Sequence, residues 1–201
     1  MKRILQTLIF FFSFVITTNG FALETLAKGK TKGRIKFESI PTITLNQFLR
    51  GETNIKSIKI HGQLKFPKKE SAEPLPAVVL LHGSGGPRKG VKHWSKILEK
   101  LGLVTFIVDS NSTRGCPLDS KSRCKNYAEH QGMGNIIDAY RALELLSTHP
   151  QIDPNRIALM GFSVGGKATL YASVKRFQKM WGTPGLEFAA YIPFYPACNI
   201  T

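Results

Sequence analysis

A serine flanked by glycines is the side chain in this sequence with the clearest capacity for chemistry. Ser163 stands at the centre of the segment GFSVG (161–165), between the apolar run 156–160 and a stretch with alanine and leucine at helical spacing. The pattern predicts a strand, a sharp turn and a helix, with the serine hydroxyl exposed at the turn. Glycines let the two elements approach closely, and the first amides of the helix would face a developing oxyanion. The chemistry indicated is nucleophilic attack on a carbonyl carbon.

Ser163 also fits a plainer role, because serine is a favoured N-cap of any helix. A second glycine-rich segment favours the chemical interpretation. The residues HGSGG (82–86) directly follow the continuous apolar run 77–81, which is typical of a strand buried on both faces. Two such turns after neighbouring strands are more specific together than either is alone.

The rest of the chain predicts the sheet that would position these turns. Strands that alternate with helices indicate a parallel sheet with helices on both faces. Alternating polarity near the start indicates a half-exposed antiparallel edge. The expected elements are half-exposed strands within 37–49 and 55–66, buried strands at 77–81, 103–108, 156–160 and 188–195, and helices around 94–101, within 126–148 and after Ser163.

The first 22 residues have the composition of an export signal. Lys2 and Arg3 precede an apolar run over 4–16, and the small residues around Ala22 suit a cleavage site. We expect a signal peptide over 1–22 and an exported protein, periplasmic or secreted, after cleavage near Ala22. The apolar run is short for a membrane span, so we expect no stable membrane anchor, although an uncleaved anchor is the alternative. Residues 23–56 would be a lead-in, and 57–201 one partial α/β domain.

Composition limits the other function classes. The 201 residues are 42% hydrophobic and 20% charged, as expected for one globular domain. The net charge is +15, but the lysines and arginines are spread along the chain without a long basic run. This spread favours a generally basic surface, so we expect no nucleic-acid partner. Oligomeric state is left open.

The three cysteines predict one short disulfide, because export permits disulfides. Cys116 and Cys124 lie close together in a polar loop and are the expected pair. Cys198 is left over, and we expect it to be a buried free thiol. The sequence has no cysteine–histidine cluster, and we expect neither a metal nor a cofactor.

The two glycine-rich turns resemble the α/β-hydrolase superfamily. The pairs Asp109-Ser110 and Arg114-Gly115, with the helical segment 138–143, make the chain similar to its dienelactone-hydrolase-like members, from about Lys59 to Cys198. The resemblance implies an α/β-hydrolase fold, a mostly parallel sheet with helices on both faces and the last strands missing.

The resemblance also implies roles for individual residues. Ser163 would be the nucleophile, acting on a small-molecule acyl substrate. The amide of Val164 would be one oxyanion donor, and the second would come from Ser84 or Gly85. His82 would brace this second turn, in preference to taking a proton.

The catalytic base is the part that the sequence does not supply. A serine nucleophile needs a histidine and an orienting acid, which in this superfamily follow the serine. After Ser163 there is no histidine, and the one carboxylate is Glu187, placed before the last expected strand. His130 could line the mouth of the site, but nothing fixes its direction.

Two explanations fit this gap: the chain is an N-terminal portion of a longer protein, or it is a natural product without the catalytic pair. We predict a serine hydrolase for an ester, lactone or related acyl bond, with the acid and histidine of the triad absent from this chain, so that the chain alone is inactive. The alternative is a non-catalytic exported α/β-hydrolase-like binding protein or an inactive fragment.

Overall fold

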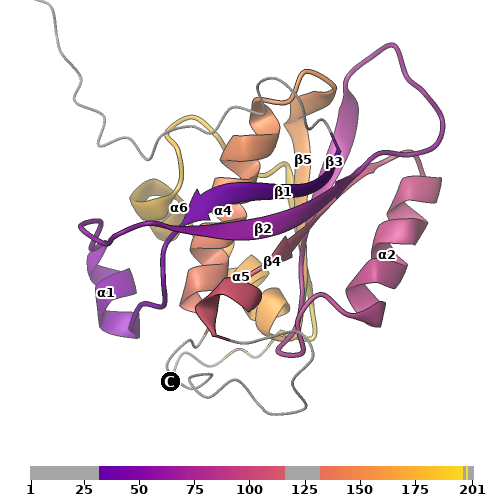
Figure 1. The fold of residues 1–201 in the computed structure, drawn as a ribbon. Helices are drawn as coiled ribbons and strands as arrows, with labels where there is room; N and C mark the ends of the chain where they lie inside the picture. Colours follow the sequence, from indigo (N-terminus) through magenta and orange to yellow (C-terminus); the bar gives the residue numbers. More distant parts are fainter. Residues whose placement is uncertain (1–31, 116–131, 197, 199–201) are drawn as a thin grey trace, which may run out of the picture.

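Six strands form one mixed sheet in the computed structural model, which describes residues 32–115, 132–196 and 198 (Figure 1). The strands are β1 (Gly33–Ser39), β2 (Ile58–Lys65), β3 (Leu75–Leu81), β4 (Val104–Asp109), β5 (Ile152–Phe162) and β6 (Ala190–Phe194). Their order across the sheet is β1-β2-β4-β3-β5-β6. Strand β2 pairs antiparallel with β1 and β4, whereas the pairs β4–β3, β3–β5 and β5–β6 are parallel. The predicted sheet, mostly parallel with an antiparallel edge, is confirmed.

Helices cover both faces of this sheet. They are α1 (Leu45–Arg50), α2 (Lys89–Lys100), the short 3-10 helix η1 (Ser112–Arg114), α4 (Met133–Ser147), α5 (Val164–Ala172) and α6 (Lys175–Trp181). Val79 and Leu81 of β3 join the larger core with α4, whereas Val78 and Leu80 pack with Val91 of α2. Because neighbouring strand residues point to opposite faces, α2 lies on one side and α4, α5 and α6 lie on the other (Figure 1).

The buried runs explain why the strands at the centre of the sheet were predictable. Every residue of β4 is buried, and so are the last five residues of β3, as expected for strands covered on both faces. Their parallel pairing brings the ends of β3 and β5 together, with Leu81 opposite Gly161. The two glycine-rich turns therefore leave the sheet at the same end, where the parallel strands have their carboxyl ends.

The start of the chain differs from the prediction. Strand β1 begins at Gly33, inside the stretch expected to be a lead-in, and its Phe37 is buried in the main core. The expected strand within 37–49 is partly wrong, because α1 occupies its second half. Thr44 and Gln47 form a capping box at the start of α1, and this local signal for a helix overrides the alternating pattern. Residues 33–50 are thus part of the sheet and its core.

The helix expected within 126–148 is described as α4, and the other central elements match their predictions within a few residues. Strand β5 begins at Ile152, four residues before the expected start, because its first residue pairs with Leu75 of β3. Cys116, Cys124 and His130 lie outside the described residues. Cys198 is a free thiol as expected, but the prediction that it is buried is wrong, since it is exposed next to the end of β6. Within the described ranges, no helix is long and apolar enough to cross a membrane.

Candidate active site

Ser163 occupies a strained turn between β5 and α5. Its backbone has φ 54° and ψ −113°, in a region that residues with a side chain rarely adopt, at a cost of about 1–3 kcal/mol. The turn is held from both sides: the Ser163 amide donates to the Phe194 carbonyl at 3.1 Å, and the Lys167 amide donates to the Ser163 carbonyl at 2.8 Å. The neighbouring backbone therefore holds Ser163 in this strained conformation.

Glycines make the close packing around this turn possible. A Cβ at Gly161 would collide with the Gly165 carbonyl and with the Thr169 hydroxyl. A Cβ at Gly165 would lie 2.5 Å from the Leu81 carbonyl oxygen. Helix α5 therefore begins directly against the end of β3, a distance that only glycine allows.

The segment 83–86 forms a turn beside Ser163. The Gly86 amide donates to the Gly83 carbonyl at 3.1 Å, so the amides of the two central residues, Ser84 and Gly85, are not used by this bond. A Cβ at Gly83 would be 3.5 Å from the Ser163 Cβ. Val164 is the first residue of α5, a position whose amide has no acceptor within the helix. The predicted oxyanion donors thus come from two segments that meet next to Ser163.

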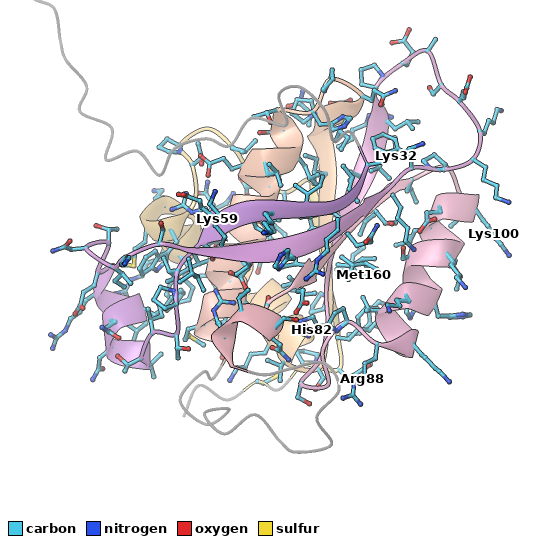
Figure 2. All side chains as sticks on the ribbon, in the orientation of Figure 1. Lys32, Lys59, His82, Arg88, Lys100 and Met160 are labelled. Carbon is cyan, nitrogen blue, oxygen red and sulfur yellow. The ribbon has the colours of Figure 1, made fainter. Side chains whose placement is uncertain are left out.

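His82 braces the turn through both ring nitrogens. Its Nε2 accepts a hydrogen bond from the Ser110 amide at 3.2 Å, and its Nδ1 lies 2.6 Å from the Gly83 carbonyl oxygen. Because Nε2 accepts, the proton of the neutral ring is on Nδ1 and is donated to that carbonyl. Burial lowers the pKa of His82, which favours the neutral form. His82 lies at the same end of the sheet as Arg88, where α2 begins (Figure 2).

A loop after β4 holds the same turn from the other side. The Asn111 side-chain amide donates to the Ser84 carbonyl at 3.2 Å. Asp109 orders this loop, because its carboxylate accepts the amides of Asn111 and Ser112 and also the Ser112 hydroxyl. The sequence singled out Asp109 only through resemblance, and its role is to order the segment that carries Asn111.

A buried ion pair anchors this loop to the protein. Both terminal nitrogens of Arg114 lie 2.8 Å from the two carboxylate oxygens of Asp138 on α4, and the two side chains are 5% and 0% exposed. The guanidinium also donates to the carbonyls of Ser110 and Ile40, and Ser39 donates to the same carboxylate. The end of β1, the loop after β4 and α4 are thereby joined at one point, a connection that sequence reasoning did not find.

Aromatic side chains form a wall on the α2 side of the Ser163 turn. Phe162 stacks on Phe194 with ring centroids 5.2 Å apart, and Trp94 of α2 lies 5.3 Å from Phe194. Tyr195, 70% exposed, continues this wall past the end of β6. Since Ser163 follows Phe162 in the chain and its amide bonds to Phe194, an apolar acyl group could rest on this wall.

No described histidine other than His82 is close to Ser163. His61 lies on β2, His93 is exposed on α2, and His149 follows α4 at the opposite end of the sheet, where its Nδ1 accepts the Gln151 amide. Glu187 forms an ion pair with Lys175 before β6. Within the part of the chain that the structure describes, Ser163 thus lacks the base and acid of a triad.

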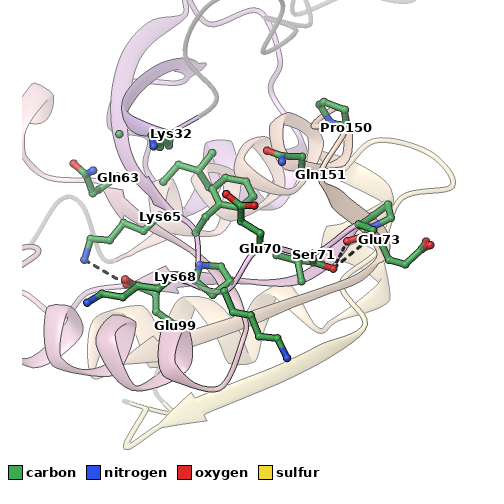
Figure 3. A pocket seen from close by; sticks show the side chains of 18 residues that line it. Lys32, Gln63, Lys65, Lys68, Glu70, Ser71, Glu73, Glu99, Pro150 and Gln151 are labelled. Atoms are coloured by element: carbon green, nitrogen blue, oxygen red, sulfur yellow. Dashed lines mark hydrogen bonds and ion pairs between the residues drawn. The ribbon is translucent and has the colours of Figure 1, made fainter.

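A cavity of about 940 Å³ lies at the opposite end of the sheet, where β3 begins (Figure 3). It is lined by the segment 66–75 before β3 and by Lys32, Lys65, Glu99 and Gln151, and the ion pair between Lys65 and Glu99 measures 3.4 Å. Because β3 begins at this cavity and ends at the turn next to Ser163, the cavity and the nucleophile candidate are separated by the length of the strand. It is not part of the candidate active site.

A mostly parallel sheet that carries a strained serine turn and a second glycine-rich turn at one edge is the arrangement of an α/β hydrolase. Residues 60–199 match the dienelactone hydrolase family, and this chain belongs to that family.

Individual known proteins are more distant. The chain is 24% identical over 139 residues to the non-reducing polyketide synthase pkbA of Emericella nidulans, covering 68% of this chain and 5% of the synthase. Among solved structures it is similar to a dienelactone hydrolase-like promiscuous phosphotriesterase from metagenomic libraries (20% identity, TM-score 0.47, 70% of this chain and 54% of the other). It is also similar to an acetyl xylan esterase from Paenibacillus (22% identity, TM-score 0.44, 57% and 40%). The chain thus spans about half the length of the solved relatives it matches.

Proposed function

We propose that this chain provides the nucleophile and the oxyanion hole of a serine hydrolase that acts on an ester or lactone of a small molecule. One observation carries the proposal: Ser163 stands at φ 54° between β5 and α5, with the Gly83 turn beside its Cβ. Membership of the dienelactone hydrolase family over residues 60–199 supports the reaction class.

The chemistry would proceed by addition to the acyl carbon. The Ser163 oxygen bonds to the carbonyl carbon, the carbonyl electron pair moves to its oxygen, and that oxygen accepts hydrogen bonds from the Val164 amide and from Ser84 or Gly85. Collapse of the intermediate expels the alcohol, and water then hydrolyses the acyl-serine. Proton transfer in both steps requires a base, which we place outside the described residues, because both ring nitrogens of His82 are engaged with the backbone.

A fluorophosphonate probe tests the nucleophile. Phosphorus accepts attack by an activated serine as an acyl carbon does, and the adduct is stable enough for peptide mapping. In a version of the protein that includes the catalytic base, we expect one adduct on the peptide that contains Ser163 and none in the Ser163→Ala variant, with unfolded protein as the control for chance reaction of other serines. A folded protein that acquires no adduct, or acquires it equally on other serines, would favour the alternative, a non-catalytic binding protein of the same fold.

Turnover of p-nitrophenyl acetate tests where the base is. If no residue of this chain serves as the base, Ser163→Ala changes the rate by less than about twofold, because the hydroxyl of serine is a weak nucleophile without one. A large loss on this substitution would place a base within the chain. His130→Ala would then identify whether the histidine outside the described residues is that base.

A further inference from the structure

The outer side of α2 carries only basic side chains. With 3.6 residues per turn, Lys89, Lys92, His93, Lys96 and Lys100 fall within an arc of about 100° around the helix axis, and all five are exposed. The four lysines of this set are called the cationic face below. The opposite side of the helix is packed on the sheet through Val91 and Ser95, which are buried.

The one carboxylate of α2 does not neutralise this face. Glu99 is turned toward the sheet, where its carboxylate accepts the hydroxyls of Ser95 and Thr105 and lies 3.4 Å from Lys65 of β2. Its charge therefore faces the sheet and does not offset the charges of the four lysines. The structure records no ion pair of the four lysines with any other described residue.

The charge pattern of α2 works against the helix itself. Lys92 and Lys96, and Lys96 and Lys100, are like charges one turn apart, which repel. Arg88 caps the helix and Lys89 begins it, and the first turn contains no acidic residue, although the helix dipole favours negative charge there. An anion bound along this side would relieve both effects, so the pattern fits a surface made for a negatively charged partner.

The chemistry of the face favours a lipid surface over a nucleic acid. Trp94, the one tryptophan of the helix, is turned inward against Phe162 and Phe194, so its indole offers no platform on which a base could stack. The cations of the face are lysines, which are flexible point charges without the fork geometry that arginine uses to recognise single phosphates. The helix lies at the outer margin of the molecule, with Arg88 and Lys100 marking its two ends (Figure 2), so a broad surface can meet the whole row.

We propose that the cationic face of α2 docks the protein on a membrane rich in anionic phospholipid. The lysines attract the negative headgroups without fixed pairing, at a gain of about fivefold in affinity for each lysine near the surface. The Ser163 turn leaves the sheet at the end of β5, against the aromatic wall to which Trp94 of α2 contributes. Docking through α2 would hold that wall close to the bilayer surface.

Co-sedimentation of the full chain with vesicles tests the proposal. One set of vesicles is phosphatidylcholine alone, and the other contains equal parts of phosphatidylcholine and phosphatidylglycerol. The test variant is Lys92→Glu with Lys96→Glu. The control is Arg176→Glu with Lys179→Glu, which makes the same change of charge on exposed residues of α6, on the other side of the sheet. Both variants keep the apolar segment 4–16, so its contribution cancels, and circular dichroism checks that each is folded.

We expect binding that requires phosphatidylglycerol and is lost near 1 M salt, where the Debye length is about 3 Å. The α2 variant should bind at least about 25-fold more weakly, from two lysines at fivefold each, and the α6 variant should stay within about twofold of the unaltered chain. Equal losses in both variants would overturn the proposal, since total charge would then explain the binding. Equal binding to both vesicles would also overturn it. Tighter binding to heparin or a polynucleotide than to vesicles would assign the face to a soluble polyanion instead. If the α2 variant does not fold, Lys92→Gln with Lys96→Gln replaces it, with Arg176→Gln and Lys179→Gln as its control.

Discussion

Asp138→Asn should destabilise the protein more than almost any other change of one charge. The Asp138 side chain is fully buried and accepts two hydrogen bonds from Arg114 and one from Ser39. Asparagine has the same shape, but it leaves the buried guanidinium without a counter-charge and places an amide donor among donors. Removing one partner of a buried ion pair costs about 3–5 kcal/mol. For a chain of this size, 3 kcal/mol lowers Tm by about 6–12 °C.

Thermal unfolding followed by circular dichroism measures this loss, with Asp153→Asn as the matched control. Asp153 pairs with Arg156 at 2.6 Å on the surface, where the arginine side chain is 54% exposed, so removing its charge should cost far less stability than removing the charge of Asp138. A double-mutant cycle with Arg114→Met should give a coupling energy above about 1.5 kcal/mol, since the two side chains are in direct contact. A coupling energy near zero, or equal costs for Asp138→Asn and Asp153→Asn, would refute the claim that this pair anchors the loop beside the active site.

Three further predictions concern the site itself. His82→Gln should reduce the loss of stability between pH 7 and 5. Burial lowers the folded-state pKa of His82 below its ordinary 6.5, so the unfolded state takes up a proton at a higher pH than the folded state does. Stability is therefore lost as pH falls, at no more than about 1.4 kcal/mol per pH unit. Urea titrations at several pH values, with the exposed His93→Gln as control, measure this slope, and identical slopes would contradict it. Gly161→Ala should cost about 3 kcal/mol or more, because the added Cβ would meet the Gly165 carbonyl. Gly90 has open space around it, so Gly90→Ala should stabilise α2 by up to about 1 kcal/mol. Equal effects of the two substitutions in urea unfolding would refute the packing argument. Ser163→Gly should raise stability by about 1 kcal/mol through relief of backbone strain while Ser163→Ala does not, and no difference in Tm between the two would count against the strained turn.

The central sheet was predictable because burial on both faces leaves a direct mark on the sequence. The continuous apolar runs gave β3 and β4 nearly to the residue, and each is followed by its polar or glycine-rich turn. The turn at Ser163 was predictable because an apolar strand, a serine between glycines and a helical pattern follow one another directly in the sequence. The outcome at α1 shows the limit: a capping box of Thr44 and Gln47 is a short signal, and the alternating residues around it indicated a strand.

The supports of the site were not predictable, because they join residues that are distant in the chain. Arg114 and Asp138 appeared only as points of resemblance. Nothing in their spacing indicates that they form a bidentate ion pair, or that Arg114 also donates to the Ile40 carbonyl. His82 is a similar case. Its position after β3 is compatible with a base or a brace, and only the two backbone contacts of its ring distinguish these roles.

A crystal structure of a version of the protein that includes the catalytic base, solved after reaction with a fluorophosphonate, would test the central claim most directly. We predict a covalent bond from the Ser163 oxygen to phosphorus, with the phosphonyl oxygen about 3 Å from the Val164 amide and from the amide of Ser84 or Gly85. A phosphonyl oxygen that contacts neither segment, or a Ser163 hydroxyl left unreacted in the folded protein, would contradict the account of this turn as the nucleophile and oxyanion hole of a hydrolase.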